Sequence, residues 1–178
     1  MKGVFVLALK ELTTQKAGLA KWQEAFGRAG FGMREVILPI TEVDDTACKR
    51  LIGALCIVLR LTITELGEMF GMFWMTVYVP RIFSLYFKNI RSAREFILRL
   101  DNIHQSTGNF TPNARPPRFA CTEQDQQTIL IKYTSHREMI EFVIGLLYGL
   151  GAYYKEELVI TPVGNSTVRV VFPSGKRK

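Results

Sequence analysis

The alternation of apolar and polar positions divides the chain into a helical first part and a mixed second part. Over the first 110 residues apolar side chains recur at helical spacing, whereas the last 60 combine strand-like alternation with one apolar helix. Three helix starts are marked by polar caps: Asp44 precedes an apolar-periodic stretch, and Thr62 and Ser92 are each followed by a glutamate three residues later. The pattern predicts an α+β fold in which the helices come first.

Two hairpins separated by a helix are predicted in the second part. The segment 119–133 has a polar Gln/Asp turn between two strand-like runs, and the strands 157–161 and 167–172 flank a turn signal that contains Pro and Gly. An apolar helix is predicted from His136 to about Leu150. Together these elements predict four antiparallel strands with a packed helix.

A single domain, residues 1–178, is expected because no repeat or low-complexity linker divides the chain. The apolar fraction of 48%, with 11% aromatic residues, exceeds what a simple core needs and suggests a lined pocket or a partner face. The longest apolar run, 142–154, is interrupted by glycines and is shorter than the roughly 20 residues of a membrane span. No membrane span is therefore expected.

Several classes of function are disfavoured by what the sequence lacks. The start of the chain has no uninterrupted apolar core of a secretion signal, which favours a cytoplasmic location. Cys48, Cys56 and Cys121 form no CxxC pair, so neither a zinc ribbon nor a disulfide framework is indicated. Part of the net charge of +7 lies in the Lys-Arg-Lys tail at 176–178, and acids and bases are mixed elsewhere, so nucleic acid is not favoured. No nucleophile–base pair is found, which predicts that the chain is not an enzyme.

Tyr133, Ser135 and Arg137 lie where a strand is predicted to end and a helix to begin. Helix N-termini attract anions, and an arginine in the first turn opposes the helix dipole unless an anion is present. With two hydroxyl donors nearby, the motif fits a carboxylate or phosphate site. It also fits a plain helix cap in which Ser135 pairs with Glu138.

His104 is predicted to lie on the same helix face as Ile97 and Leu100, pointing into the core. A lone histidine on an apolar face is typical of a packed core residue, so a role as metal or haem ligand needs independent support. The Arg-Pro-Pro-Arg segment at 115–118, which includes Pro117, predicts a rigid extended entry into the first hairpin.

These features follow one another in a characteristic order: Leu-Asp-Asn-Ile-His at 100–104, then Arg-Pro-Pro, then Tyr-x-Ser-x-Arg at 133–137. This order resembles the H-NOX family, the haem nitric oxide/oxygen binding domains related to the haem domain of soluble guanylate cyclase. The resemblance extends from Met-Lys-Gly-Val at 1–4, through Phe-Gly-Met-Phe-Trp at 70–74, to Gly-Leu-Leu-Tyr-Gly at 145–149. It implies that haem is buried between the N-terminal helical part and the four-stranded sheet with its helix.

The resemblance also implies residue roles toward haem b. His104 corresponds to the proximal iron ligand, and Tyr133, Ser135 and Arg137 correspond to the residues that hydrogen-bond the haem propionates. Pro117 matches the family's proline that presses on the porphyrin and keeps it non-planar.

The choice of gas depends on the distal pocket, for which the family implies Phe5, Leu9, Trp74, Phe142 and Leu146. Family members that bind dioxygen stably have a distal tyrosine donor, and Phe142 stands at the matching position. Bound dioxygen gains from a donor whereas bound nitric oxide needs little, so nitric oxide, and also carbon monoxide, is the expected ligand. Tyr78 lies one helical turn from Trp74, and its phenol would supply the missing hydrogen-bond donor if it entered the pocket instead of packing elsewhere.

The family implies a mechanism in which nitric oxide weakens the bond between ferrous iron and His104, and the helix bearing His104 shifts. The output passes to a separate partner, and family partners include histidine kinases and cyclic-di-nucleotide enzymes. The alternative is a haem-free module that binds a carboxylate or phosphate ligand through Tyr133, Ser135 and Arg137, with His104 buried in the core.

Overall fold

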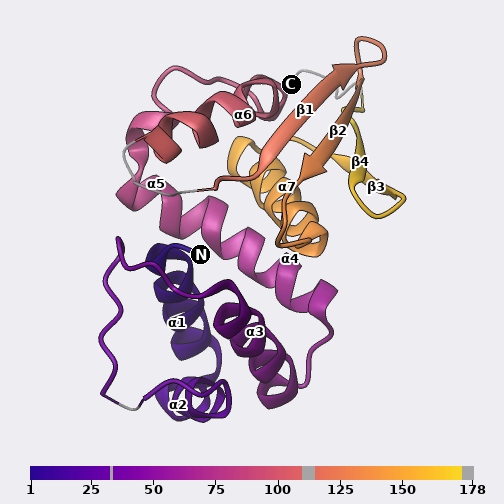
Figure 1. Ribbon diagram of the computed structural model, residues 1–178. Coiled ribbons are helices and arrows are strands. Elements are labelled where there is room, and N and C mark those ends of the chain that lie inside the picture. Colours follow the sequence, from indigo (N-terminus) through magenta and orange to yellow (C-terminus); the bar gives the residue numbers. More distant parts are fainter. Residues whose placement is uncertain (33, 110–114, 174–178) are drawn as a thin grey trace. The chain divides into compact units, whose positions relative to one another are not determined.

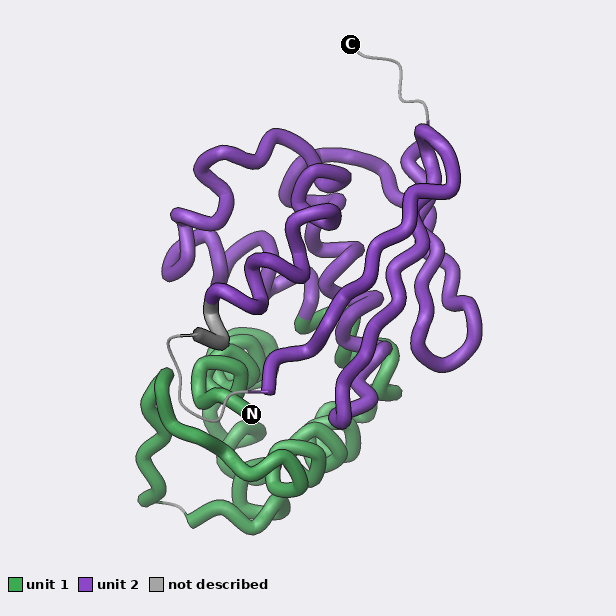
Figure 2. Tube along the Cα trace, turned by 45° about the horizontal axis from the view of Figure 1, so that its top comes forward, with its two compact units in different colours: residues 1–70 green, residues 71–178 purple. Residues whose placement is uncertain are grey.

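The computed structural model describes residues 1–32, 34–109 and 115–173, and it confirms the predicted α+β class. The chain forms two compact units, unit 1 (residues 1–70) and unit 2 (residues 71–178), shown in Figure 2. None of the helices in the described ranges is long and apolar enough to cross a membrane. The basic tail at 176–178 lies outside the described residues, and a single functional domain stays a prediction.

Unit 1 is helical (Figure 1) and contains α1 (Gly3–Ala17), α2 (Leu19–Arg28), α3 (Asp45–Leu59) and most of α4 (Ile63–Phe73). Gly18 joins α1 to α2 with a φ of 89°, a backbone conformation that favours glycine. Buried apolar side chains at helical spacing form the core of this unit: Val6, Leu9, Leu12, Leu51, Leu55, Leu66 and Phe70.

The predicted helix caps at Asp44 and Thr62 are confirmed. The Asp44 carboxylate accepts a hydrogen bond from the Ala47 backbone N–H at 2.9 Å. Thr62 and Glu65 form the reciprocal pair: the Glu65 backbone N–H donates to Thr62 Oγ1 at 3.2 Å, and the Thr62 backbone N–H donates to Glu65 Oε2 at 2.7 Å. Polar side chains therefore satisfy otherwise unpaired N–H groups where α3 and α4 begin.

Unit 2 begins within α4 and continues through a series of short and long helices (Figure 1). They are the π-helix η1 (Trp74–Tyr78), α5 (Val79–Ile82), the 3-10 helix η2 (Ser84–Tyr86), α6 (Ala93–Asn109) and, after the first hairpin, α7 (Ile140–Tyr154). Figure 1 shows α6 and α7 beside the sheet.

The sheet of unit 2 consists of the two predicted hairpins. Its strands are β1 (Arg118–Glu123), β2 (Thr128–Thr134), β3 (Val159–Val163) and β4 (Thr167–Val171), all antiparallel in the order β1-β2-β4-β3. Alternate residues of each strand point to the same side of the sheet, and one of the two faces that they form is buried.

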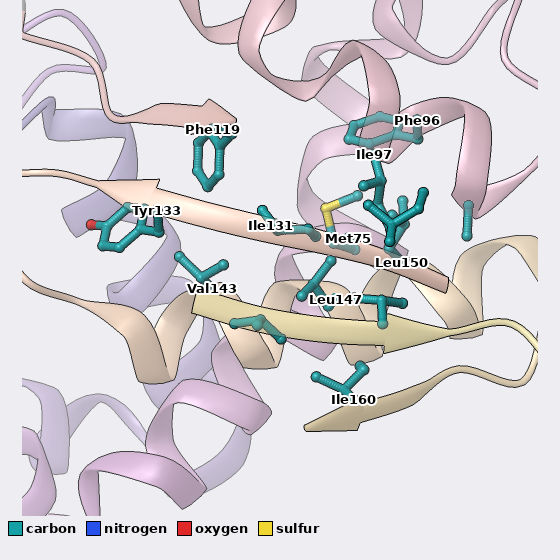
Figure 3. Packing of buried hydrophobic residues seen from close by; sticks show 14 of the residues in the cluster. Met75, Phe96, Ile97, Phe119, Ile131, Tyr133, Val143, Leu147, Leu150 and Ile160 are labelled. Carbon is teal, nitrogen blue, oxygen red and sulfur yellow. The ribbon is translucent and has the colours of Figure 1, made fainter. Parts of the chain in front are cut away.

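The core of unit 2 lies between this face and the two long helices. In β2 the alternate residues Ile129, Ile131 and Tyr133 are buried, whereas Lys132 and Thr134 are exposed. Figure 3 shows Ile131 and Tyr133 together with side chains from both helices, Phe96, Ile97, Val143, Leu147 and Leu150. The sheet therefore holds α6, the helix of the candidate histidine, through ordinary apolar packing.

α4 and α7 approach each other at glycines. A Cβ atom added at Gly71 would overlap the backbone of Gly145, and one added at Gly149 would overlap the Gly71 carbonyl. Only residues without a side chain allow this close backbone contact.

We expect Gly71→Ala to destabilise the protein by about 1–3 kcal/mol or more, because the added methyl group has no space. The midpoint of urea unfolding measures this effect. Gly53→Ala is the matched control, since nothing lies within 4 Å of the added Cβ and the site is inside α3. That change should stabilise by about 1 kcal/mol through helix propensity. Equal midpoints for the two variants would show that the glycine contact does not matter for stability.

Candidate functional site

α6, the helix that carries the candidate histidine, is anchored at its first turn. The Glu95 backbone N–H donates to Ser92 Oγ at 3.1 Å, which confirms the predicted cap. The Glu95 carboxylate accepts at 2.9 Å from the backbone N–H of Arg91, the residue before the cap, and not from that of Ser92. The Ala93 backbone N–H donates to Glu156 Oε2 at 3.1 Å. Since Glu156 follows the end of α7, this contact fixes the start of α6 against the end of α7.

His104 is half-buried, and its ring makes a hydrogen bond within its own helix. Nδ1 lies 2.9 Å from the Leu100 carbonyl oxygen. A carbonyl oxygen only accepts, so Nδ1 carries the proton and Nε2 has the lone pair. Burial lowers the pKa of His104, against the smaller opposing effects of the Leu100 hydrogen bond and of Asp101. The imidazole is therefore neutral, the form in which histidine binds a metal.

The His104 ring contacts the first hairpin. Its centroid is 4.8 Å from that of the Phe119 ring, which in turn is 5.5 Å from that of the Tyr133 ring. Phe119 and Tyr133 are direct partners in the β1–β2 register, and Figure 3 shows their side chains near each other. The histidine and the first residue of the Tyr-x-Ser-x-Arg motif are thus connected through one aromatic ring.

Asp101 joins α6 to the start of β1, a role that the sequence patterns did not reveal. Its carboxylate accepts hydrogen bonds from Arg118 Nε and Nη2, each at 2.9 Å, and from the Phe119 backbone N–H at 2.9 Å. The Arg118 hydrogen bond is the main reason why the pKa of Asp101 is lowered. These partners are 17 and 18 residues away in sequence, so no local spacing signalled the contact.

We expect Asp101→Asn to lower the free energy of unfolding by about 1 kcal/mol at pH 7, a modest loss because the partner Arg118 is largely exposed. A carboxylate with a lowered pKa stabilises the fold above its ordinary pKa of 3.8, and this contribution is lost as the pH falls through the lower folded value. The difference between wild type and variant in urea unfolding should therefore shrink in acid. A double-mutant cycle with Arg118→Gln should be non-additive, and additive effects would mean that the two side chains do not interact.

The segment from Ser135 to Ile140 corrects a prediction. α7 begins at Ile140 and not at His136, because Glu138 has a φ of 55° and a left-handed residue interrupts a helix. Ser135 Oγ instead accepts a hydrogen bond from the Arg137 backbone N–H at 3.2 Å, which closes a short turn. Arg137 therefore precedes the helix, and the argument from the helix dipole does not apply to it.

The candidate donors nevertheless gather at one end of the β1–β2 ladder. The ladder ends with the first residue of β1 and the last residue of β2, so Pro117 and Ser135 follow directly at this end. Arg137 Nη1 donates to the Arg115 carbonyl at 3.0 Å, which places the guanidinium against the Arg-Pro-Pro segment. Pro117 is half-buried and Tyr133 is buried. Residues from two distant motifs therefore form one neighbourhood.

The predicted distal residues fall on three elements. Phe5 and Leu9 lie on α1 in unit 1, where Leu9 is fully buried. Trp74 is the first residue of η1 in unit 2. Phe142, which is buried, and Leu146 lie one turn apart on α7, which packs against η1. These side chains supply apolar surface, with the Trp74 indole N–H as their one side-chain donor.

Tyr78 is buried and stacks on Trp74, with 5.4 Å between the ring centroids. The Arg81 guanidinium lies 5.3 Å from the Tyr78 ring centroid. Both rings belong to a π-helical turn in which the Val79 backbone N–H donates to the Trp74 carbonyl. Sequence periodicity predicted an α-helical turn here, and π-turns have no periodic signature of their own.

The donor set favours one class of ligand. In the described ranges, no three His, Cys, Asp or Glu side chains come close enough to hold a metal ion by themselves. One neutral imidazole, with two hydroxyls and a guanidinium nearby, suits a cofactor that carries its own metal ligands and also carboxylates. The chemistry of the residues therefore fits haem.

Comparisons with known proteins point the same way. A family model described as Haem-NO-binding matches residues 2–162. Soluble guanylate cyclase gcy-34 from Caenorhabditis elegans is 23% identical over 147 residues, which cover 81% of this chain and 21% of that relative. The chain thus spans about a fifth of the length of the relative.

Solved structures share the fold. A Cs H-NOX mutant with the unnatural amino acid 4-cyano-L-phenylalanine matches with a TM-score of 0.87 and 22% identity over 100% of both chains. An oxygen-binding H-NOX domain related to soluble guanylate cyclases matches with a TM-score of 0.82 and 22% identity, over 100% of this chain and 98% of that one. Since the family model covers most of the sequence and the H-NOX fold extends over the whole of it, the chain belongs to the Haem-NO-binding family of H-NOX domains.

Proposed function

We propose that this chain is a haem-based sensor that binds haem b and responds to nitric oxide. The observation that carries the proposal is the state of His104, a neutral imidazole whose Nδ1–H is held by the Leu100 carbonyl. Its lone pair is therefore on Nε2, the atom that would bind the iron. Membership of the Haem-NO-binding family supports the same cofactor.

Tyr133, Ser135 and Arg137 would bind the haem propionates. The two hydroxyls and the guanidinium lie within five residues, and the contact between Arg137 and the Arg115 carbonyl limits where the guanidinium can go. Pro117 lies at the same end of the ladder and would press on the porphyrin, since its ring fixes the backbone angle φ and makes the segment rigid.

The distal side chains would set the choice of gas. When bound, the haem supplies ferrous iron as the atom that takes the gas. Phe142 and Leu146 have no hydrogen-bond donor with which to stabilise the charge on bound dioxygen. Nitric oxide and carbon monoxide need little such help, so they are the gas ligands that we propose.

The signal would travel through α6. His104 would hold the helix to the cofactor, and Asp101 holds it to β1. Nitric oxide would weaken the hold of His104, and the end of α6 beyond Asp101 would be released. The output would pass to a separate histidine kinase or cyclic-di-nucleotide enzyme. We propose that the chain itself acts in the cytoplasm as one non-enzymatic domain, residues 1–178, without binding nucleic acid.

Absorption spectra test this proposal. The purified ferrous protein should show a Soret band that shifts with nitric oxide and with carbon monoxide and does not shift in air. A stable dioxygen complex would contradict the claim about gas choice. A protein without any Soret band after expression with added haem would favour the alternative, a haem-free module, which should then bind octanoate or inorganic phosphate through Arg137.

A further inference from the structure

Apart from the terminal tail, the net positive charge of the chain is concentrated in one segment. Residues 81–99 have five basic side chains and one acid, a net charge of +4, and no acid occurs between Glu68 and Glu95. The Lys-Arg-Lys tail supplies +3, and the remaining residues have 15 bases and 15 acids. The segment runs from α5 through η2 into α6 (Figure 1). The charge is therefore a local feature of unit 2.

Most of these basic side chains are available at the surface. Lys88 and Arg91 are exposed, and within the ranges that the structure describes neither side chain takes part in a salt bridge. Arg99 is half-exposed and lies 2.6 Å from a Glu95 carboxylate oxygen. Arg94 is different, because it pairs with Glu123 and is mostly covered.

An open pocket of about 550 Å³ lies between η2 and α6, within this basic region. Its apolar walls include Leu85, Tyr86 and Ile103, and Leu85 is 81% exposed. Asn89 and Arg99 also line it. An exposed leucine at the mouth of an apolar pocket within a basic segment is typical of a surface that receives an apolar anchor from a protein partner.

We propose that η2 and the outer side of α6 form a docking surface for a partner protein that presents an acidic segment with one apolar side chain. The acidic groups would face Lys88, Arg91 and Arg99, and the apolar side chain would enter the pocket beside Leu85. Charge complementarity favours this occupant, since Lys88 and Arg91 are exposed cations next in sequence to the lining residues Asn89 and Ile90, and the mouth of the pocket is apolar.

The location connects docking to sensing. Arg99, Asn102, Ile103 and Ser106 line the pocket at helical spacing on α6, whereas Asp101 and His104 contact the hairpin. A partner on the outer side would therefore detect a shift of the helix. This coupling rests on the proposed function, whereas docking by itself does not.

Selection of a random dodecapeptide library on the full chain, without gas, tests docking. We expect selected peptides rich in Asp and Glu around one large apolar residue. Their affinity should fall at least about tenfold in the double variant Lys88→Glu, Arg91→Glu, because attraction becomes repulsion. Lys49→Glu, an exposed charge reversal on α3, should have no effect. Peptides without acidic enrichment, or an equal loss in both variants, would overturn the proposal.

The apolar contact has its own control. Leu85→Asp should lower the affinity for the same peptides at least about tenfold. Ile57→Asp, at a residue on α3 that is 67% exposed, should leave this affinity unchanged. Both sites are exposed, so the fold should survive. Two other occupants would also overturn the proposal. One is a membrane, if phosphatidylserine vesicles bind the protein and the peptides do not compete with them. The other is a second copy of the chain, if sedimentation shows a dimer that the double variant Lys88→Glu, Arg91→Glu dissociates.

Coupling is tested separately with the haem-loaded ferrous protein. Peptide affinity should change at least about twofold when nitric oxide is added, because the ligand shifts a helix that lines the pocket. A Soret shift with nitric oxide but unchanged peptide affinity would overturn the coupling and leave the sensor proposal standing. Absence of the Soret band would instead count against the sensor proposal.

Discussion

Replacing His104 by glycine should lower the haem content of the purified protein at least about tenfold. Loss of a residue that only hydrogen-bonds a metal ligand already lowers metal affinity about 10–100-fold, and loss of the ligand itself should cost at least as much. The variant removes the Nε2 lone pair that we propose as the protein ligand of the iron. Added imidazole should restore much of the Soret band, because it supplies the same donor in the space that the side chain leaves. Absorption after expression with added haem measures both effects.

Glycine also weakens a helix, so the control must share that cost. Gln105→Gly lies next to His104 on α6 and loses the same helix propensity, about 1 kcal/mol, while keeping the imidazole. It should retain haem. If both variants lose haem equally and imidazole restores neither, the loss comes from the helix and His104 is not the ligand.

Replacing Phe142 by tyrosine should slow the dissociation of dioxygen from the ferrous protein about tenfold to a hundredfold. A hydrogen bond to a charged group contributes about 1.5–3 kcal/mol, and 1.4 kcal/mol corresponds to a factor of ten. The wild-type protein has an apolar ring at this buried position on α7. Dissociation rates from stopped-flow mixing, or a stable spectrum in air, measure the effect.

The control for this change removes the ring without adding a donor. Phe142→Leu should not gain dioxygen binding, whereas both variants should still bind carbon monoxide, which shows that haem and pocket are intact. A tyrosine variant that binds carbon monoxide normally and releases dioxygen as fast as wild type would show that position 142 does not face the gas.

Local signals predicted the fold well where the structure depends on neighbouring residues. The caps at Asp44, Thr62 and Ser92 were predicted because each acceptor serves an N–H three residues further on. The hairpins were predicted from the alternation in the strands and from the turn residues between them. These interactions are short-range, so the sequence contains all of their parts.

Long-range and backbone effects limited the prediction of the site. The start of α7 was misplaced because Glu138 adopts a left-handed conformation that its residue type does not signal. The carboxylate of Asp101 was overlooked since its partners Arg118 and Phe119 come from another element. His104 and Tyr133 were both predicted, but no pattern showed that Phe119 would connect them.

The π-turn from Trp74 to Tyr78 has a consequence for comparing relatives position by position. Its hydrogen bond from Val79 to Trp74 spans one residue more than an α-helical bond. A relative that lacks this extra residue would show a one-residue gap here, and each residue of an α-helix turns the chain by about 100°. Numbering carried across such a gap would rotate every residue after the turn by that angle relative to its true counterpart. An alignment should therefore be anchored separately before and after the turn.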